Sequence, residues 1–257
     1  MGTFRSFVRI VDRQTVAVTL LALVSTWVCI RHEILADLPS ALIGIAVIFP
    51  IVFSINSAYR RREEALKYLA SAKAHALAIA WAHRDWTGGQ EDLVRQGRRL
   101  LEELFDVLRR FFPVGTDGDD DVLREVYGTF SDLSKSHEDL RAAGVPANEV
   151  SRSNQYLRAV MIDFERMRNI LQYRTPIALR AYSRVFLNGF PILYGPYFAT
   201  LAAESMPAVG YGVAVLYSVV LVSLDNIQEA LENPYGTIDE DDVDVGKDLR
   251  ELLEVSG

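Results

Sequence analysis

The stretch Ile43–Glu64, IGIAVIFPIVFSINSAYRRREE, changes along its length from apolar to small and polar, and then to strongly basic. Its apolar part, counted from Leu38 to Ile55, is close to the roughly 17–25 residues that a helix needs to cross a bilayer. Three arginines, Arg60–Arg62, follow almost at once, and arginine gathers at the cytoplasmic ends of membrane helices. The stretch therefore predicts a transmembrane helix whose carboxyl end is cytoplasmic.

Within this predicted helix, apolar side chains recur every four residues at Ile45, Phe49 and Phe53. Residues at that spacing lie on one stripe of a helix. Such a stripe ordinarily packs against lipid or against another helix. It can also line a pore, where apolar side chains form a constriction that gates by dewetting. The stripe by itself leaves both interpretations open.

The composition favours a membrane protein with a water-exposed centre. Of the 257 residues, 50% are hydrophobic and 24% are charged, and the apolar runs cluster towards both ends while charge fills the middle. We therefore expect one protomer over residues 1–257 rather than two independent domains. The formal net charge of −7 argues against a nucleic-acid partner, because nucleic-acid-binding domains usually carry a basic patch.

Four apolar segments are predicted to lie in the membrane, at about 14–31, 38–56, 178–203 and 208–231. The first follows a basic lead-in without a small-residue cleavage site after it, so we expect a retained helix rather than a signal peptide. The third contains Pro191 and Pro196, which predict a kinked or broken helix. The positive-inside rule then predicts a multi-pass protein of the cell membrane with both termini in the cytoplasm.

Residues 59–175 predict a cytosolic helical bundle, because apolar residues recur there at helical spacing and no alternating strand pattern appears. No glycine or proline interrupts the chain between Tyr59 and Asp85, so we expect the second span to continue as one long helix. Further helices are predicted at 91–112, 122–143 and 148–173. The tail over 233–257 is acidic and ends in a short amphipathic helix.

The sequence carries little that indicates catalysis. His83-Arg84-Asp85 matches a fragment of a kinase catalytic loop, but no glycine-rich loop accompanies it. The four histidines show no spacing of four residues that would hold zinc. The single cysteine, Cys29, excludes an intrachain disulfide and is expected to be a small buried hydrophobe. We therefore predict that the protein is not an enzyme and requires no cofactor.

The acidic run Asp239–Asp242 is a candidate site for a hard cation, since Ca²⁺ takes several carboxylate and carbonyl oxygens. Pro234 and Gly236, just before it, favour a tight turn that could fold the acids back. The alternative is a solvated acidic tail. The candidate calcium ligands are Asn233, Asp239, Asp241 and Asp242.

Several of these motifs resemble the bestrophin family of pentameric ion channels, in its short prokaryotic form. Asn56-Ser57-Ala58-Tyr59 with Arg61 resembles the family's signature at the cytoplasmic end of the second helix. Phe190-Pro191-Ile192-Leu193-Tyr194 resembles its proline–apolar–tyrosine motif in the third segment. Leu224-Asp225-Asn226-Ile227 and Glu232-Asn233-Pro234-Tyr235-Gly236, with the acids that follow, resemble the end of the fourth segment and the calcium clasp.

The resemblance implies an all-α membrane protein with four transmembrane helices and a cytosolic helical bundle. It implies a homopentamer in lipid that conducts small ions, with Ile45, Phe49 and Phe53 in the pore neck and calcium at the tail. The sequence departs from the family pattern at Arg62 and Glu63, which replace a tryptophan pair. It also departs at Ala230, where animal members supply a calcium-binding glutamine.

The ions that such a channel would conduct are predicted less directly. Members of the family conduct either chloride or cations. Aromatic ring edges carry partial positive charge, which favours anions such as chloride if the edges point inward. A cation-selective channel of the same fold is one alternative. A non-conducting membrane scaffold or sensor, whose helical bundle binds a cytosolic partner, is the other.

Overall fold

The computed structural model describes residues 12–37, 40–114, 120–173, 177–232, 234–235, 243, 245 and 253–254. Within these ranges the regular structure is helical and contains no strand. The predicted all-α fold class is therefore confirmed for the described residues. The chain packs as two compact units, Met1–Arg60 with Thr175–Glu232 (unit 1), and Arg61–Arg174 with Asn233–Gly257 (unit 2).

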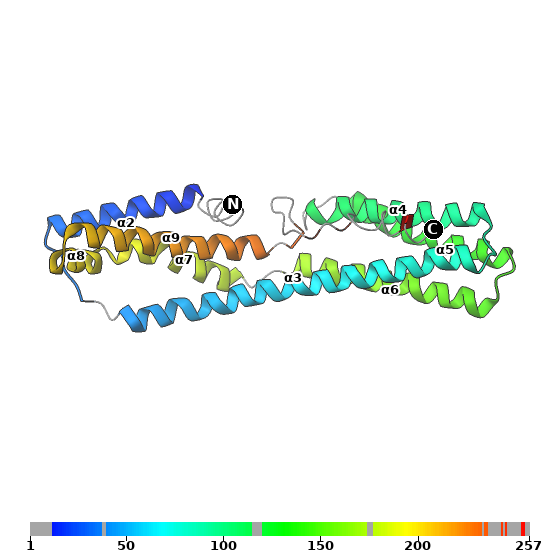
Figure 1. The fold of residues 1–257 in the computed structure, drawn as a ribbon, viewed down its shortest axis with the longest axis horizontal. Helices are drawn as coiled ribbons and strands as arrows, with labels where there is room; N and C mark the ends of the chain where they lie inside the picture. Colours follow the sequence, from blue (N-terminus) through cyan, green and yellow to red (C-terminus); the bar gives the residue numbers. More distant parts are fainter. Residues whose placement is uncertain are drawn as a thin grey trace. The chain divides into compact units, whose positions relative to one another are not determined.

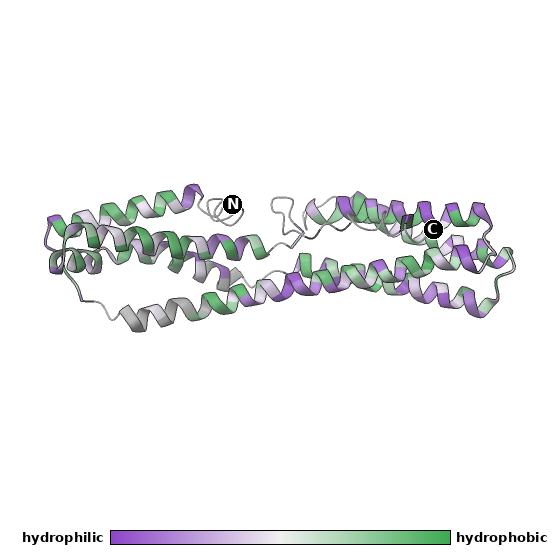
Figure 2. Ribbon diagram, viewed as in Figure 1, coloured by the Kyte–Doolittle hydropathy of each residue, from purple (hydrophilic) through white to green (hydrophobic). Residues whose placement is uncertain are grey.

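Unit 1 is a bundle of apolar helices. Helix α2 packs against α7, α8 and α9, and α8 and α9 pack against each other. Hydrophobic residues predominate along α2, α8 and α9 (Figure 2), as expected for helices surrounded by lipid. The bundle comprises α2 (Arg13–Arg31), the start of α3 (Ser40–Asp85), α7 (Ile177–Leu193), α8 (Gly195–Glu204) and α9 (Pro207–Glu232), shown in Figure 1.

The third apolar segment is broken into two helices, as its prolines predicted. Pro191 lies inside the last turn of α7, and Pro196 lies in the first turn of α8. Tyr194 separates the two helices. Proline cannot donate a backbone hydrogen bond, but at the first turn of a helix none is needed. The break therefore costs α8 little at its start.

Two of the four predicted spans are long and apolar enough, within the described residues, to cross a membrane. They are Arg13–Arg31 and Pro207–Leu231, which match the predicted first and fourth segments. The third segment does not meet the same length test because it is broken, and the side chains of much of the second lie outside the described residues. The arrangement with four transmembrane segments therefore stays a prediction.

Helix α3 runs for 46 residues, so the predicted long second helix is confirmed. It ends at Asp85, and a turn follows. Gly88 and Gly89 have positive φ angles of 65° and 79°, which glycine adopts without the strain of a Cβ. The Gly89 amide donates to the carbonyl of Arg84 at 2.9 Å and so satisfies one of the last carbonyls of the helix.

Unit 2 is a bundle of amphipathic helices. The buried apolar faces of α4, α5 and α6 form one continuous core with α3, while charged residues cover the outside (Figure 2). The predicted helix boundaries are correct to within about two residues, except that Pro113 lies inside the last turn of α4 rather than beyond it. The helices are α4 (Glu91–Val114), α5 (Asp120–Ala142) and α6 (Ala147–Gln172).

Candidate functional site

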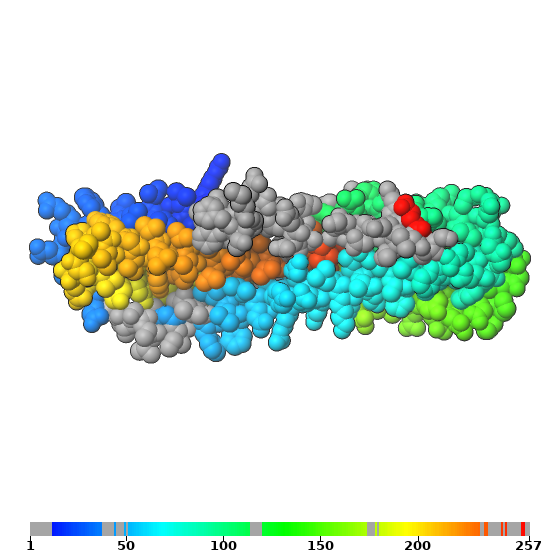
Figure 3. Space-filling model, viewed as in Figure 1, coloured from blue at the N-terminus to red at the C-terminus, as the bar shows by residue number. Residues whose placement is uncertain are grey.

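The predicted neck residues lie on the part of α3 that belongs to unit 1. Phe49 is 62% exposed and Phe53 is 57% exposed. Their rings meet edge to face, with centroids 4.8 Å apart. Ile45 belongs to the same helix and the same stripe, although its side chain lies outside the described residues. The light-blue part of α3 forms part of the molecular surface (Figure 3).

The opposite face of the same helix packs within unit 1. Ile51 lies two residues from each phenylalanine, about 200° around the helix axis. It is only 2% exposed and packs with Leu187 of α7 and Leu221 of α9. Helix α3 therefore packs on its own chain through the Ile51 face, and this chain alone does not bury the phenylalanine face. In a membrane, the phenylalanine face must therefore contact lipid, contact a neighbouring copy or line a dry pore.

Arg61, from the signature after the second span, contacts the end of another helix of unit 2. Its guanidinium donates to the backbone carbonyl of Ile170, in the last turn of α6. A cation at this position satisfies a carbonyl that has no partner within the helix and opposes the negative end of the helix dipole. The signature arginine therefore ties α3 to α6.

The predicted calcium ligands Asn233, Asp239, Asp241 and Asp242 lie outside the described residues. The two residues that bracket the acids are described, and the Val243 amide donates to the carbonyl of Pro234 at 2.8 Å. Among the described residues, no cluster of three or more metal-binding side chains occurs.

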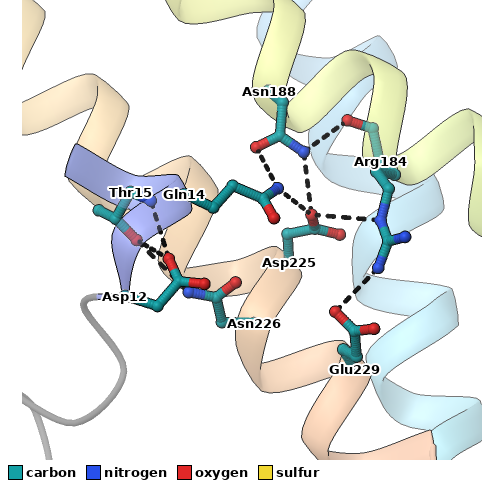
Figure 4. Close-up of polar contacts among 8 residues, drawn as sticks. All are labelled: Asp12, Gln14, Thr15, Arg184, Asn188, Asp225, Asn226 and Glu229. Atoms are coloured by element: carbon teal, nitrogen blue, oxygen red, sulfur yellow. Dashed lines mark hydrogen bonds and ion pairs between the residues drawn. The ribbon is translucent and has the colours of Figure 1, made fainter. Parts of the chain in front are cut away.

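A buried carboxylate forms the centre of a polar cluster in unit 1 (Figure 4). Asp225 of α9 is 5% exposed, and its Oδ2 accepts from Asn188 Nδ2 of α7 at 2.9 Å and from Gln14 Nε2 of α2 at 3.4 Å. Gln14 Nε2 also donates to Asn188 Oδ1 at 2.9 Å. Arg184 Nε lies 4.0 Å from Asp225 Oδ2, and Arg184 Nη2 donates to Glu229 at 2.8 Å. These five residues are called the Asp225 cluster below.

The Asp225 cluster joins α2, α7 and α9 at the start of α2. The same start is capped by Asp12, whose Oδ1 accepts from the Thr15 amide at 2.8 Å. Asn226 Nδ2 in turn donates to Thr15 Oγ1 at 3.4 Å, which links the cap to α9. A carboxylate taken out of water is stable only when donors surround it, so these contacts hold the three helix segments together.

Sequence reasoning did not find this cluster. Asp225 was noted only as part of a motif, although it lies in a segment predicted to span the membrane, and an ionisable residue there is by default a functional candidate. Its partners Gln14 and Asn188 come from helices that are distant in sequence. No spacing rule predicts such contacts.

Replacing Asp225 by alanine should destabilise unit 1 substantially, because the amides of Gln14 and Asn188 would lose their shared acceptor in a buried place. We expect a loss of about 3 kcal/mol in the free energy of unfolding. For a chain of this size, that loss lowers the midpoint of thermal unfolding by roughly 6–12 °C. Unfolding of the purified protein in detergent measures it.

Glu229→Gln is the matched control for this variant. Glu229 pairs with the same Arg184 but its side chain is 65% exposed, so its loss should change the midpoint by only about 1–2 °C. Equal effects of the two substitutions would contradict the central role of Asp225.

No protein-family model and no curated protein matches the chain. Several solved structures do. A bacterial bestrophin homolog from Klebsiella pneumoniae, in one single-residue variant, matches with a TM-score of 0.79 at 18% identity over 95% of this chain and 99% of the other. Another variant of that homolog gives 0.77 at 17% identity over 95% and 98%.

A third structure, described as a membrane protein, matches with a TM-score of 0.79 at 17% identity, over 96% of this chain and 100% of the other. These likenesses extend over nearly the whole of each chain, and they agree with the family resemblance of the sequence. The chain therefore has a bestrophin-like fold.

Proposed function

We propose that this chain assembles in a membrane into a homopentamer that conducts small ions through a neck lined by Ile45, Phe49 and Phe53. The observation that carries the proposal is the outward phenylalanine face of α3 in a chain with a bestrophin-like fold. Around a symmetry axis, one copy of that face from each protomer would form a closed apolar collar. Such a collar conducts when wet and blocks ions when it loses its water.

The proposed permeant ion is an anion such as chloride. The rings of Phe49 and Phe53 meet edge to face. The ring that presents its face to the other therefore keeps its own edge free to point towards an ion. A ring edge carries partial positive charge and attracts anions. Cation selection by the same fold remains the alternative that the experiment must distinguish.

Two measurements on the purified full-length protein test the proposal. Its mass in detergent should be that of five chains, and in planar bilayers it should carry current whose reversal potential under asymmetric KCl has the sign for chloride. The opposite sign supports the cation channel. A monomer or dimer without current supports a scaffold and overturns the proposal.

The proposed topology puts both termini and residues 59–175 in the cytoplasm of a multi-pass cell-membrane protein. Asp120→Cys, made in a Cys29→Ala background, should therefore resist a membrane-impermeant maleimide in intact cells and react after lysis. Ser205→Cys, between α8 and α9, should react from outside and is the positive control. External labelling at position 120 would contradict this topology.

The tail is proposed to bind Ca²⁺, with Asn233, Asp239, Asp241 and Asp242 as candidate ligands. The hydrogen bond from the Val243 amide to the carbonyl of Pro234 and the hard oxygen donors between these residues in the sequence support the proposal. Calorimetry should show saturable calcium binding that Asp241→Asn with Asp242→Asn weakens at least about tenfold, while the oligomer stays intact.

Asp120→Asn with Asp121→Asn is a matched control for the tail variant, since it removes two exposed carboxylates at the start of α5. It should leave calcium binding unchanged. Calcium binding that is absent from the wild type, or lost equally in both variants, would mean that the tail is a solvated acidic segment.

A further inference from the structure

Two histidines of unit 2 are buried side by side. His83 of α3 is 0% exposed and His137 of α5 is 1% exposed, and their ring centroids lie 5.9 Å apart. Neither is part of the proposed ion pathway. A buried imidazole is a group whose charge changes near neutral pH, so its hydrogen bonds determine whether it can take up a proton.

The hydrogen bonds of His83 specify its neutral form. Nδ1 lies 2.9 Å from the carbonyl oxygen of Ile79, which only accepts, so Nδ1 carries the hydrogen. Nε2 lies 3.1 Å from Ser136 Oγ and therefore accepts from that hydroxyl when the ring is neutral. The Ser136 hydroxyl also lies 2.8 Å from the carbonyl oxygen of Leu133. It has one hydrogen and two acceptors within reach.

Because the Ser136 hydroxyl has this second acceptor, His83 can be protonated without leaving a polar group unpaired. When Nε2 gains a proton, it becomes a donor to Ser136 Oγ, and the hydroxyl hydrogen turns to the carbonyl of Leu133. Every polar group then still has a partner. Proton uptake at His83 therefore rearranges the hydrogen bonds without breaking the network.

His137 cannot be protonated without losing a hydrogen bond. Its Nδ1 lies 2.7 Å from Asn154 Oδ1 and its Nε2 lies 3.0 Å from Ser153 Oγ. Within the described residues, the Ser153 hydroxyl has no second acceptor, so a proton on Nε2 would turn the hydroxyl away and leave its hydrogen without a partner. A charge on His83 only 5.9 Å away further opposes a charge on His137. We therefore expect the pair to bind one proton, on His83.

The surroundings of the pair contain little charge. From α4, Gly97 lies against the His83 ring so closely that a Cβ there would come 2.6 Å from Cγ. From α5, Asp139 is the charged group that favours protonation of His83, and it accepts from Gln96 Nε2 at 2.8 Å. From α6, the groups facing His137 are the neutral side chains of Ser153 and Asn154.

We propose that His83 is a proton-binding site of unit 2, and that proton uptake there as the pH falls below neutrality loosens α3 from α4 and α5. The loosening follows from burial, because an imidazolium in a nearly dry site costs free energy that an opened bundle recovers by letting water in. The proposal does not depend on conduction.

The direction of the pH dependence follows from linkage. Burial lowers the pKa of both His83 and His137 below the ordinary value of about 6.5. Below that pH the unfolded chain binds more protons than the folded chain, so the free energy of unfolding falls as the pH decreases. Above about pH 7.5 these two histidines should contribute no pH dependence.

The test uses the full-length protein in lipid, labelled with ¹⁵N-histidine. Since the chain has four histidines, single variants assign the ¹⁵N signals. We expect His83 to change from the Nδ1–H form to imidazolium at a pH below about 6.5, while His137 stays neutral. In Ser136→Ala, which removes the hydroxyl that turns, the change at His83 should move to lower pH. The midpoint of thermal unfolding should fall by roughly 5–10 °C between pH 7.5 and 5.5.

His83→Gln should remove about half of the fall in the unfolding midpoint. If His83→Gln does not fold, the spectra of the wild type and of Ser136→Ala decide. Protonation of both buried histidines together, or an unmoved His83 transition in Ser136→Ala, overturns the proposal.

Discussion

Replacing Ile45, Phe49 and Phe53 together by alanine should raise the single-channel conductance severalfold and weaken gating. The substitutions remove three side chains from one stripe of α3 and so widen the proposed collar. A wider collar fills with water at a lower free-energy cost, and ions then cross it while keeping more of their hydration shell. Because Phe49 and Phe53 are 62% and 57% exposed, their loss opens no cavity in the protomer core.

Leu216→Ala is the matched control for the neck variant, since Leu216 of α9 is an apolar side chain that is 65% exposed. It should leave conductance unchanged in the same planar-bilayer recordings. An unchanged conductance in the triple variant, with the oligomer intact, would remove these residues from the pore. The stripe would then be a lipid-facing or helix-packing surface.

The sequence predicted the helices well because each is specified by local signals. Glycine and proline mark most of the helix ends, and apolar residues at helical spacing on α6, among them Val160, Phe164 and Met167, lie in the core. The helix break near Pro191 and Pro196 was also predictable, since proline disrupts the backbone hydrogen bonds within one turn. Cys29, 6% exposed, is buried as predicted.

The polar clusters were not predictable in the same way. Asp225 meets Gln14 across more than two hundred positions of sequence, and His83 meets Ser136 across 53. Such contacts depend on which helix faces touch, and helical periodicity indicates only which faces are apolar. His83 was considered in a catalytic motif and as a possible metal ligand, whereas the structure shows a hydrogen-bonded histidine within the core.

Tyr235 should prove to be a main anchor of the tail on the helices of unit 2, beside Val243, Val245 and Leu253, which are buried in the same core. It is 1% exposed, and its ring lies against Phe112 of α4 with centroids 4.5 Å apart. Phe112 in turn contacts Phe164 of α6, at 6.0 Å between centroids. The tyrosine side chain therefore fills a place in the aromatic core rather than resting on the surface.

Tyr235→Ala would leave a cavity of aromatic size in that core. We expect a loss of about 3–5 kcal/mol in the free energy of unfolding, which lowers the midpoint of thermal unfolding by roughly 10 °C. Limited proteolysis should also cut the chain beyond Tyr235 faster than in the wild type, because the contact of its ring with Phe112 would be lost. Both measurements use the full-length protein in detergent.

Tyr235→Phe is the control that separates packing from hydrogen bonding. The phenol oxygen lies 3.5 Å from the carbonyl oxygen of Met167, which is a long contact, so its removal should cost only about 1 kcal/mol. The ring stays in place in this variant, and the tail should remain resistant to protease. If Tyr235→Ala unfolds within about 2 °C of the wild type, the aromatic contact does not anchor the tail, and the buried side chains of Val243, Val245 and Leu253 hold it instead.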